Sequence, residues 1–204
     1  GELCEIVPSK MFHIGGDECV KESWKACPHC QARMKANGLG NVEELQGWMT
    51  RHFADYLASK GRRAIGWDEI LESDIPSDAI VTSWRGDAGA IEGPERGNRV
   101  ILSPNTHLYV DYYQAKDVQN EPLAIGGYIP VEKVYEFEPI PKQLTGEKAK
   151  LVCGAQANLW TEYITDFKQV QYMELPRIAA LAETVWTKPE LKNFASFRKR
   201  IPAL

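Results

Sequence analysis

Two adjacent carboxylates that follow two glycines are the part of the sequence best suited to chemistry. A short apolar run ends in His13-Ile14-Gly15-Gly16-Asp17-Glu18. In a regular strand, neighbouring side chains point to opposite faces. The two glycines free the backbone to bend, so we expect Asp17 and Glu18 to face one pocket together. Carboxylic acids held in a pocket are groups that transfer protons in enzymes.

Aromatic and acidic side chains also follow the later apolar runs of the chain. They occur in four short motifs, which are Gly66-Trp67-Asp68-Glu69, Ser83-Trp84-Arg85-Gly86, Tyr109-Val110-Asp111 and Asn158-Leu159-Trp160-Thr161-Glu162. The loops that follow the strands of an α/β barrel build its active site. We therefore expect these motifs to lie together with the carboxylate pair.

Five short apolar runs predict the strands that must position these residues. Each run is followed by a polar, glycine-rich turn and then usually by a helical pattern, which is typical of buried parallel strands. The runs are Met11 to Ile14, Arg63 to Trp67, Ala79 to Trp84, Arg99 to Ser103 and Leu151 to Ala155. Alternating strands and helices predict an α/β fold, either a doubly wound sheet or a (β/α)8 barrel.

Helical periodicity is clearest from Val42 to Ser59, where apolar side chains recur every three or four residues and Gly61 follows the end. Further helices are predicted over 88–96, 175–186 and 194–200, and the helix over 175–186 is interpreted wholly as one that packs on the sheet. The stretch from Asp111 to Lys150 is rich in glycine and proline and has little periodicity. It predicts a long loop with short helical pieces over the site.

The composition is that of an ordinary globular protein, and no repeat or linker divides the chain, so we predict a single domain over 1–204. Of the 204 residues, 44% are hydrophobic and 25% are charged. A net charge of -4 gives no basic surface for nucleic acid, and the apolar runs are too short for a membrane span. Small neutral molecules are the expected partners, with no nucleic acid, no membrane, no cofactor and no metal. The first residues lack the features of a secretory signal, so localisation is not readable.

The five cysteines predict at least one free thiol unless pairing occurs between chains. Cys27-Pro28-His29-Cys30 has the spacing of zinc and redox motifs. A zinc ribbon needs a second such pair, and a redox motif opens a helix after a strand. The sequence indicates neither context, which favours a packed loop.

The segment His13-Ile14-Gly15-Gly16-Asp17-Glu18 and the four later motifs together resemble glycoside hydrolase family 20, the β-N-acetylhexosaminidases. The order and position of the motifs are similar to that family's strand ends over essentially the whole chain. The resemblance implies a retaining exo-glycosidase that hydrolyses terminal β-linked N-acetylhexosamine, with glycans ending in N-acetylglucosamine or N-acetylgalactosamine as partners. It also implies substrate-assisted catalysis, in which the 2-acetamido oxygen attacks C1 and forms an oxazolinium intermediate.

The resemblance assigns a role to each motif residue. It implies that Glu18 is the general acid and base, that Asp17 holds the acetamide nitrogen and stabilises the oxazolinium charge, and that Tyr109 donates its hydroxyl to the acetamide oxygen. Trp67, Trp84 and Trp160 are expected to box the acetamide methyl and the sugar face. Asp111 and Glu162 are expected to accept hydrogen bonds from ring hydroxyls.

The resemblance further implies a partial TIM (β/α)8 barrel, approximately strands 4 to 8 with their helices. A complete barrel has eight strands in about 250 residues, whereas five strand candidates are present and the carboxylate pair follows the first of them. We therefore expect a C-terminal portion of a glycosidase catalytic barrel, with slower turnover than a complete barrel. Its open sheet edges favour a homodimer.

Two alternatives stay open at this point. One is a two-carboxylate retaining glycosidase, in which Asp111 or Glu162 is a covalent nucleophile about 5 to 5.5 Å from the acid. The other is a sugar-binding fragment that keeps the aromatic box but does not turn over.

Overall fold

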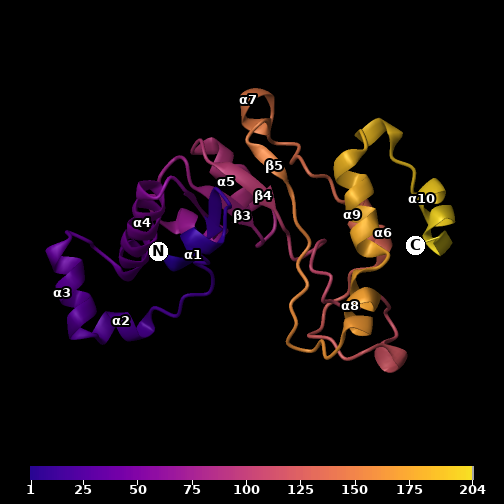
Figure 1. Ribbon diagram of the computed structural model, residues 1–204, viewed down its shortest axis with the longest axis horizontal. Coiled ribbons are helices and arrows are strands. Elements are labelled where there is room, and N and C mark those ends of the chain that lie inside the picture. The colour runs from indigo at the N-terminus through magenta and orange to yellow at the C-terminus, as the bar shows by residue number, and fades with distance from the viewer. Residues whose placement is uncertain (204) are drawn as a thin grey trace.

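The computed structural model describes residues 1–203 and shows an α/β fold around one parallel sheet (Figure 1). The five strands lie in chain order, each hydrogen-bonded in parallel to the next. They are β1 (Met11–His13), β2 (Arg63–Trp67), β3 (Ile80–Ser83), β4 (Arg99–Leu102) and β5 (Val152–Ala155). This confirms the predicted fold class, and each strand lies within one of the five predicted apolar runs.

Helices connect the strands and cover the sheet. Helix α4 (Val42–Ser59) packs on β2, and α5 (Ala88–Glu95) packs on β3 and β4. In Figure 1, the last helices form a separate group on the side of β5. The other helices are α1 (Glu2–Ile6), α2 (Glu22–Ala26), α3 (Pro28–Ala36), α6 (Val131–Glu136), α7 (Gly146–Ala149), α8 (Phe167–Glu174), α9 (Arg177–Trp186) and α10 (Phe194–Arg200), with 3-10 turns η1 (Asp68–Glu72), η2 (Val118–Asn120), η3 (Pro189–Leu191) and η4 (Ile201–Ala203).

The main core lies between the sheet and the helices that follow β3, β4 and β5. Val81 of β3 and Val100 of β4 are fully buried, together with Ala90 of α5, Val134 of α6 and Ala180 of α9. A strand that is buried on both faces has a continuous apolar sequence. The sequence therefore predicts these strands well. This core fixes the ends of β3 and β4, after which the site loops begin.

Helix α4 has the amphipathic character that its sequence predicts. The Asn41 side chain accepts a hydrogen bond from the Glu44 backbone N–H at 2.8 Å, and Glu44 in turn accepts one from the Gly40 N–H at 2.8 Å. These contacts satisfy N–H groups that have no partner within a helix. The helix buries Ala54 and Leu57 against Ala64 of β2, and it buries Leu45 against Met34 of α3.

Two expectations need correction. The segment predicted as one helix over 175–186 is helical only from Arg177, and α8 precedes it. The segment Cys27 to Cys30 is not a packed loop, because Cys27 is the N-cap of α3 and Pro28 is its first residue. A proline is well accommodated at that position, since its missing N–H has no partner in a helix.

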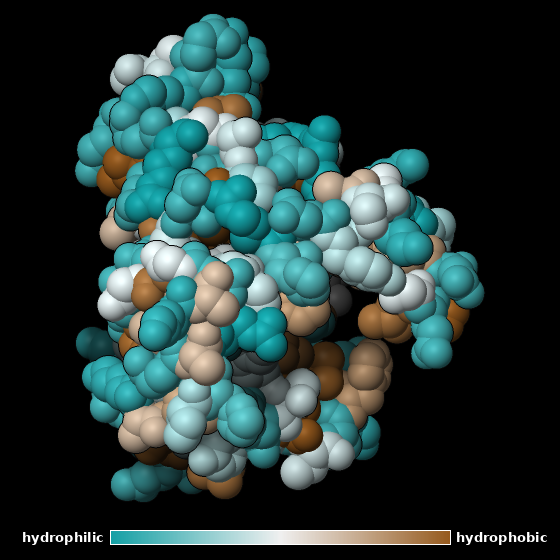
Figure 2. All heavy atoms as spheres, turned by 90° about the vertical axis from the view of Figure 1, so that its left-hand side faces the viewer, coloured by the Kyte–Doolittle hydropathy of each residue, from teal (hydrophilic) through white to brown (hydrophobic). Residues whose placement is uncertain are grey.

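The two edge strands of the sheet are β1 and β5, which are not paired with each other. Such edges expose backbone groups that another chain can pair with, and the homodimer stays a prediction. The face formed by α2, α3 and α4 is mostly hydrophilic, with hydrophobic side chains in separate spots (Figure 2). Among residues 1–203, no helix combines the length and the apolar character of a membrane span.

Candidate active site

The structure brings the eight site residues predicted from the sequence together around one cavity. The cavity has a volume of about 310 Å³, at the lower end of the range for small-molecule sites. Trp67 is the last residue of β2, and the other seven follow the ends of β1, β3, β4 and β5. The full lining is Asp17, Glu18, Trp67, Trp84, Tyr109, Asp111, Tyr112, Ile125, Trp160 and Glu162.

The carboxylate pair lies on a turn that the two glycines make possible. Gly15, Gly16 and Glu18 have φ values of 72°, 103° and 47°. Residues other than glycine seldom adopt this backbone conformation. A Cβ on Gly16 would meet the Ile70 side chain at 2.9 Å. This turn carries the exposed side chains of Asp17 and Glu18 to the cavity.

Two long-range hydrogen bonds hold this turn in place. The Trp67 backbone N–H donates to the Gly15 carbonyl at 3.0 Å, and the Gln46 side-chain amide of α4 donates to the Gly16 carbonyl at 2.8 Å. Gln46 is itself buried. The turn is therefore fixed both to the end of β2 and to α4.

Aromatic rings form one wall of the cavity. Trp67 and Trp160 lie with ring centroids 5.9 Å apart and planes inclined by 51°. Trp84 stacks on Tyr109 at 6.2 Å and 15°, and Tyr109 meets Trp160 edge-on at 6.1 Å and 65°. Trp67 and Tyr109 are buried, whereas Trp160 is partly open to solvent. Packed against one another, these rings present a stiff apolar surface.

The backbone after β4 and β5 continues the sheet pairing and so places Tyr109 and Asp111. The Val110 N–H donates to the Asn158 carbonyl at 2.8 Å, and the Asn158 N–H donates to the Leu108 carbonyl at 2.9 Å. Side chains alternate along such a segment. Tyr109 and Asp111 therefore point to the same side, where both line the cavity.

Asp111 is a buried acid without a partner in the described part of the chain. Its side chain is 4% exposed, and neither carboxylate oxygen accepts a hydrogen bond. Burial raises the pKa of Asp111 to about 6; the nearby Glu162 contributes to this rise, whereas neighbouring backbone N–H groups and Arg177 oppose it. A buried acceptor without a donor is unfavourable, so this carboxylate is suited to a ligand that brings hydroxyl donors.

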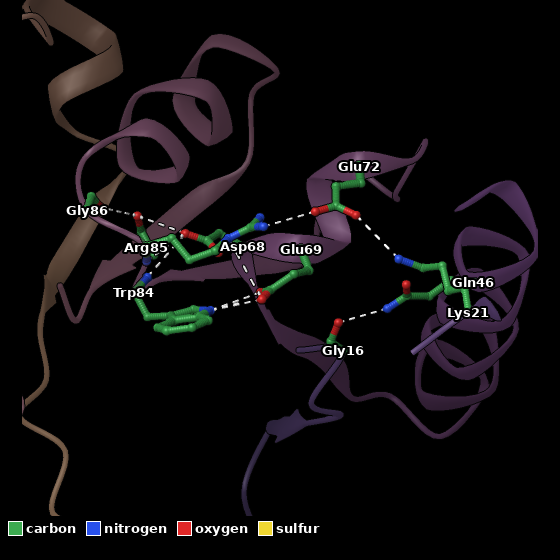
Figure 3. A network of polar contacts seen from close by, with 10 residues as sticks. Gly16, Lys21, Gln46, Asp68, Glu69, Glu72, Trp84, Arg85 and Gly86 are labelled. Carbon is green, nitrogen blue, oxygen red and sulfur yellow. Dashed lines mark hydrogen bonds and ion pairs between the residues drawn. The ribbon is translucent and has the colours of Figure 1, made fainter. Parts of the chain in front are cut away.

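A polar network behind Trp84 was not predicted from the sequence (Figure 3). The indole N–H of Trp84 donates to Glu69 Oε2 at 2.9 Å. Asp68 accepts hydrogen bonds from the backbone N–H groups of Trp84 and Arg85, both at 3.2 Å, and from Arg85 Nε at 2.8 Å. Burial raises the pKa of Glu69. Asp68 and Glu69 therefore position the Trp84 ring, and they were visible in the sequence only as neighbours of Trp67.

A second supporting residue, Arg177 of α9, was also missed. It is fully buried, and its guanidinium donates to the backbone carbonyls of Val110, Tyr112, Ile129 and Met173 at 2.5 to 3.1 Å. Burial lowers the pKa of Arg177 to about 10. No carboxylate within 4.0 Å pairs with it among the described residues, so this cation holds the Tyr109 to Tyr112 backbone through carbonyl oxygens.

We expect Arg177→Met to lower the free energy of unfolding by about 3 to 5 kcal/mol, because it leaves several buried carbonyls without donors. Urea unfolding followed by circular dichroism measures the change. The matched control is Arg200→Met, because Arg200 is exposed and pairs with Glu183 at 2.6 Å; we expect about 1 kcal/mol or less. Equal losses in the two variants would contradict the role given to Arg177.

Comparison with known proteins gives one consistent result. A family model described as the catalytic domain of glycosyl hydrolase family 20 matches residues 1–189. A beta-hexosaminidase of Porphyromonas gingivalis is 46% identical over 201 residues, which cover 98% of this chain and 26% of that protein. A beta-hexosaminidase of Vibrio furnissii is 32% identical over 183 residues, which cover 89% and 30%.

The solved structures agree. The crystal structure of a Vibrio harveyi exo beta-N-acetylglucosaminidase in complex with N-acetylglucosamine superposes with a TM-score of 0.87 at 31% identity, covering 98% of this chain and 32% of that one. The chain thus spans about a quarter to a third of the length of these relatives.

Proposed function

We propose, from the fact that this chain belongs to glycosyl hydrolase family 20, that its cavity binds a terminal β-linked N-acetylhexosamine and supplies the groups for its hydrolysis. The observation that carries the proposal is the cavity of about 310 Å³ in which an exposed carboxylate pair faces an aromatic wall and a buried acid. Aromatic faces fit the apolar face of a pyranose, and carboxylates bind its hydroxyls.

Glu18 and Asp17 are assigned the chemical steps. Glu18 protonates the leaving glycosidic oxygen and then deprotonates the water that completes the reaction. Asp17 accepts a hydrogen bond from the acetamide N–H, and its negative charge stabilises the oxazolinium ion that forms when the acetamide oxygen attacks C1. Both side chains line the same cavity, so the acid and the orienting carboxylate act on the same sugar.

Tyr109 and the three tryptophans orient the internal nucleophile. Burial raises the pKa of Tyr109 to about 12, so its hydroxyl stays protonated and donates a hydrogen bond to the acetamide oxygen. Trp67, Trp84 and Trp160 close around the acetamide methyl and exclude water from it. An attacking group held near its target in this way removes much of the entropic barrier.

Asp111 and Glu162 are assigned to the ring hydroxyls. Asp111 has two buried oxygens without donors in the described chain, and sugar hydroxyls supply them. Glu162 lies exposed at the rim of the same cavity. A charged acceptor strengthens a hydrogen bond from a hydroxyl about twofold over a neutral one.

Calorimetric titration of the purified chain with N-acetylglucosamine tests the binding half of the proposal. We expect saturable binding of N-acetylglucosamine. Glucose, which lacks the acetamide, should bind with lower affinity. Parallel assays with a chromogenic N-acetylglucosaminide test turnover. Binding without turnover would support the sugar-binding alternative, and no binding of either sugar would contradict the proposed site.

Asp111→Asn gives a second test, because stability and binding are expected to change in opposite directions. Because burial raises the pKa of Asp111 to about 6 in the fold, the neutral acid is favoured there relative to the unfolded chain. The stabilising contribution is fully present below about pH 4 and is lost as the pH rises through about 6. At pH 7.5 we expect Asp111→Asn to raise the free energy of unfolding by about 2 to 3 kcal/mol, and to weaken N-acetylglucosamine binding.

Denaturation at pH 4 and pH 7.5 measures the stability change, and the gain should vanish at the lower pH. Asp55→Asn, at an exposed position of α4, is the matched control and should be neutral at both. A loss of stability at pH 7.5 together with unchanged sugar affinity would contradict the role given to Asp111.

A further inference from the structure

The pair Cys27 and Cys30 lies outside the site described above and has the geometry of a reactive dithiol. Cys27 is the N-cap of α3 with an extended backbone, φ -75° and ψ 117°, and Cys30 is in the first turn of the same helix. All five cysteines are free thiols. No residue that lines the sugar cavity also lines the cavity beside Cys30, so the pair is independent of the proposed glycosidase chemistry.

The start of α3 carries both thiols, Cys27 at the N-cap and Cys30 in the first turn, and the two differ in acidity. The backbone N–H of Cys30 and, next in importance, its thiol lower the pKa of Cys27. The same contact and burial raise the pKa of Cys30. Unpaired N–H groups at a helix start favour a negative charge there. Cys27 is thus the sulfur that loses its proton more readily than Cys30.

The surroundings of Cys30 offer room for a reaction partner. An open cavity of about 310 Å³ is lined by Cys30, His29, Arg33, Trp24 and Trp48, with further apolar side chains from α4. The guanidinium of Arg33 lies 5.2 Å from the Trp48 ring centroid. This surface combines apolar rings with a positive charge, which suits a small anionic peptide disulfide.

We propose that Cys27 and Cys30 form a dithiol–disulfide couple that exchanges with a low-molecular-weight peptide disulfide of the glutathione type. The Cys27 thiolate attacks one sulfur of the small disulfide, which releases one small thiol and leaves a mixed disulfide on Cys27. Cys30 then loses its proton and attacks the Cys27 sulfur, which releases the second small thiol. The protein gives up two electrons and two protons, and the small disulfide is reduced to two thiols.

The test uses the full chain, reduced and then equilibrated at pH 7 in buffers of varied ratio of reduced to oxidised glutathione. Acid quenching, alkylation and peptide mass spectrometry locate each cysteine's state. We expect a Cys27–Cys30 disulfide at ratios where Cys4, Cys19 and Cys153 remain alkylatable. In Cys30→Ser the glutathione mixed disulfide should accumulate on Cys27, whereas in Cys27→Ser Cys30 should stay largely unmodified. Cys153→Ser, at an exposed position, is the matched control and should leave the pair unchanged.

A second measurement needs no variant. With limiting maleimide, Cys27 of the unmodified chain should be labelled about tenfold faster than Cys153, although Cys153 is the more exposed. The proposal is overturned if Cys153 is labelled first, if Cys27 and Cys30 stay reduced where Cys153 is already glutathionylated, or if the mixed disulfide persists on Cys27 in the unmodified chain.

Discussion

Asp17→Asn is expected to lower the rate of hydrolysis of an aryl N-acetylglucosaminide by about 10²- to 10³-fold. The amide occupies the same space on the turn after β1, but it lacks the negative charge that stabilises the oxazolinium ion. A charged hydrogen bond in a water-poor site is about twice as strong as a neutral one. Steady-state kinetics on the same chain with and without the substitution measure the ratio, which does not depend on the absolute turnover.

The control for this variant is Asp78→Asn, at an exposed position outside the cavity lining. Its rate should be unchanged. A rate for Asp17→Asn within about threefold of the unmodified chain would show that the charge of Asp17 does not contribute to the transition state.

Glu18→Gln is expected to show a dependence on the leaving group that no other variant shows. Substrates with alkyl leaving groups need a proton to depart, so their rate should fall by about 10² to 10⁴. Aryl glycosides with acidic phenols depart with little proton donation and should lose only a few-fold in the first step. The measurement compares both substrate types in the unmodified and the substituted chain.

Glu43→Gln on the exposed first turn of α4 serves as the matched control and should leave both rates unchanged. An equal loss on alkyl and aryl substrates in Glu18→Gln would mean that Glu18 acts in another way, for instance by binding the sugar.

The sheet was predictable because its strands are short apolar runs that end in glycine-containing or polar turns. Helix α4 was predictable because its apolar residues repeat with a helical period. The helices α2 and α3 were not predicted. Each is short and polar, and Met34 is the only residue of the two that is buried. Their location depends on contacts with each other and of α3 with α4, which a local pattern does not contain.

The residues that face the cavity were predictable from their motifs, whereas those that support them were not. Arg177 looked like part of a packing helix, because three of its four carbonyl partners are 48 to 67 residues away in the sequence. The role of Asp68 and Glu69 was not predicted, because the sequence does not show that η1 turns their side chains toward Trp84. Contacts of this kind form only when distant segments meet in the fold.

The most direct test of the account replaces the internal nucleophile of the substrate. Two aryl β-glycosides with the same leaving group are compared on the same chain, one with a 2-acetamido group and one with a 2-hydroxyl group. If the acetamide oxygen attacks C1, the 2-hydroxyl substrate should react at least about 10³-fold more slowly, because the positioned nucleophile is absent. Rates within tenfold of each other, together with a covalent glycosyl adduct on Asp111 or Glu162 in intact-protein mass spectrometry, would contradict the account.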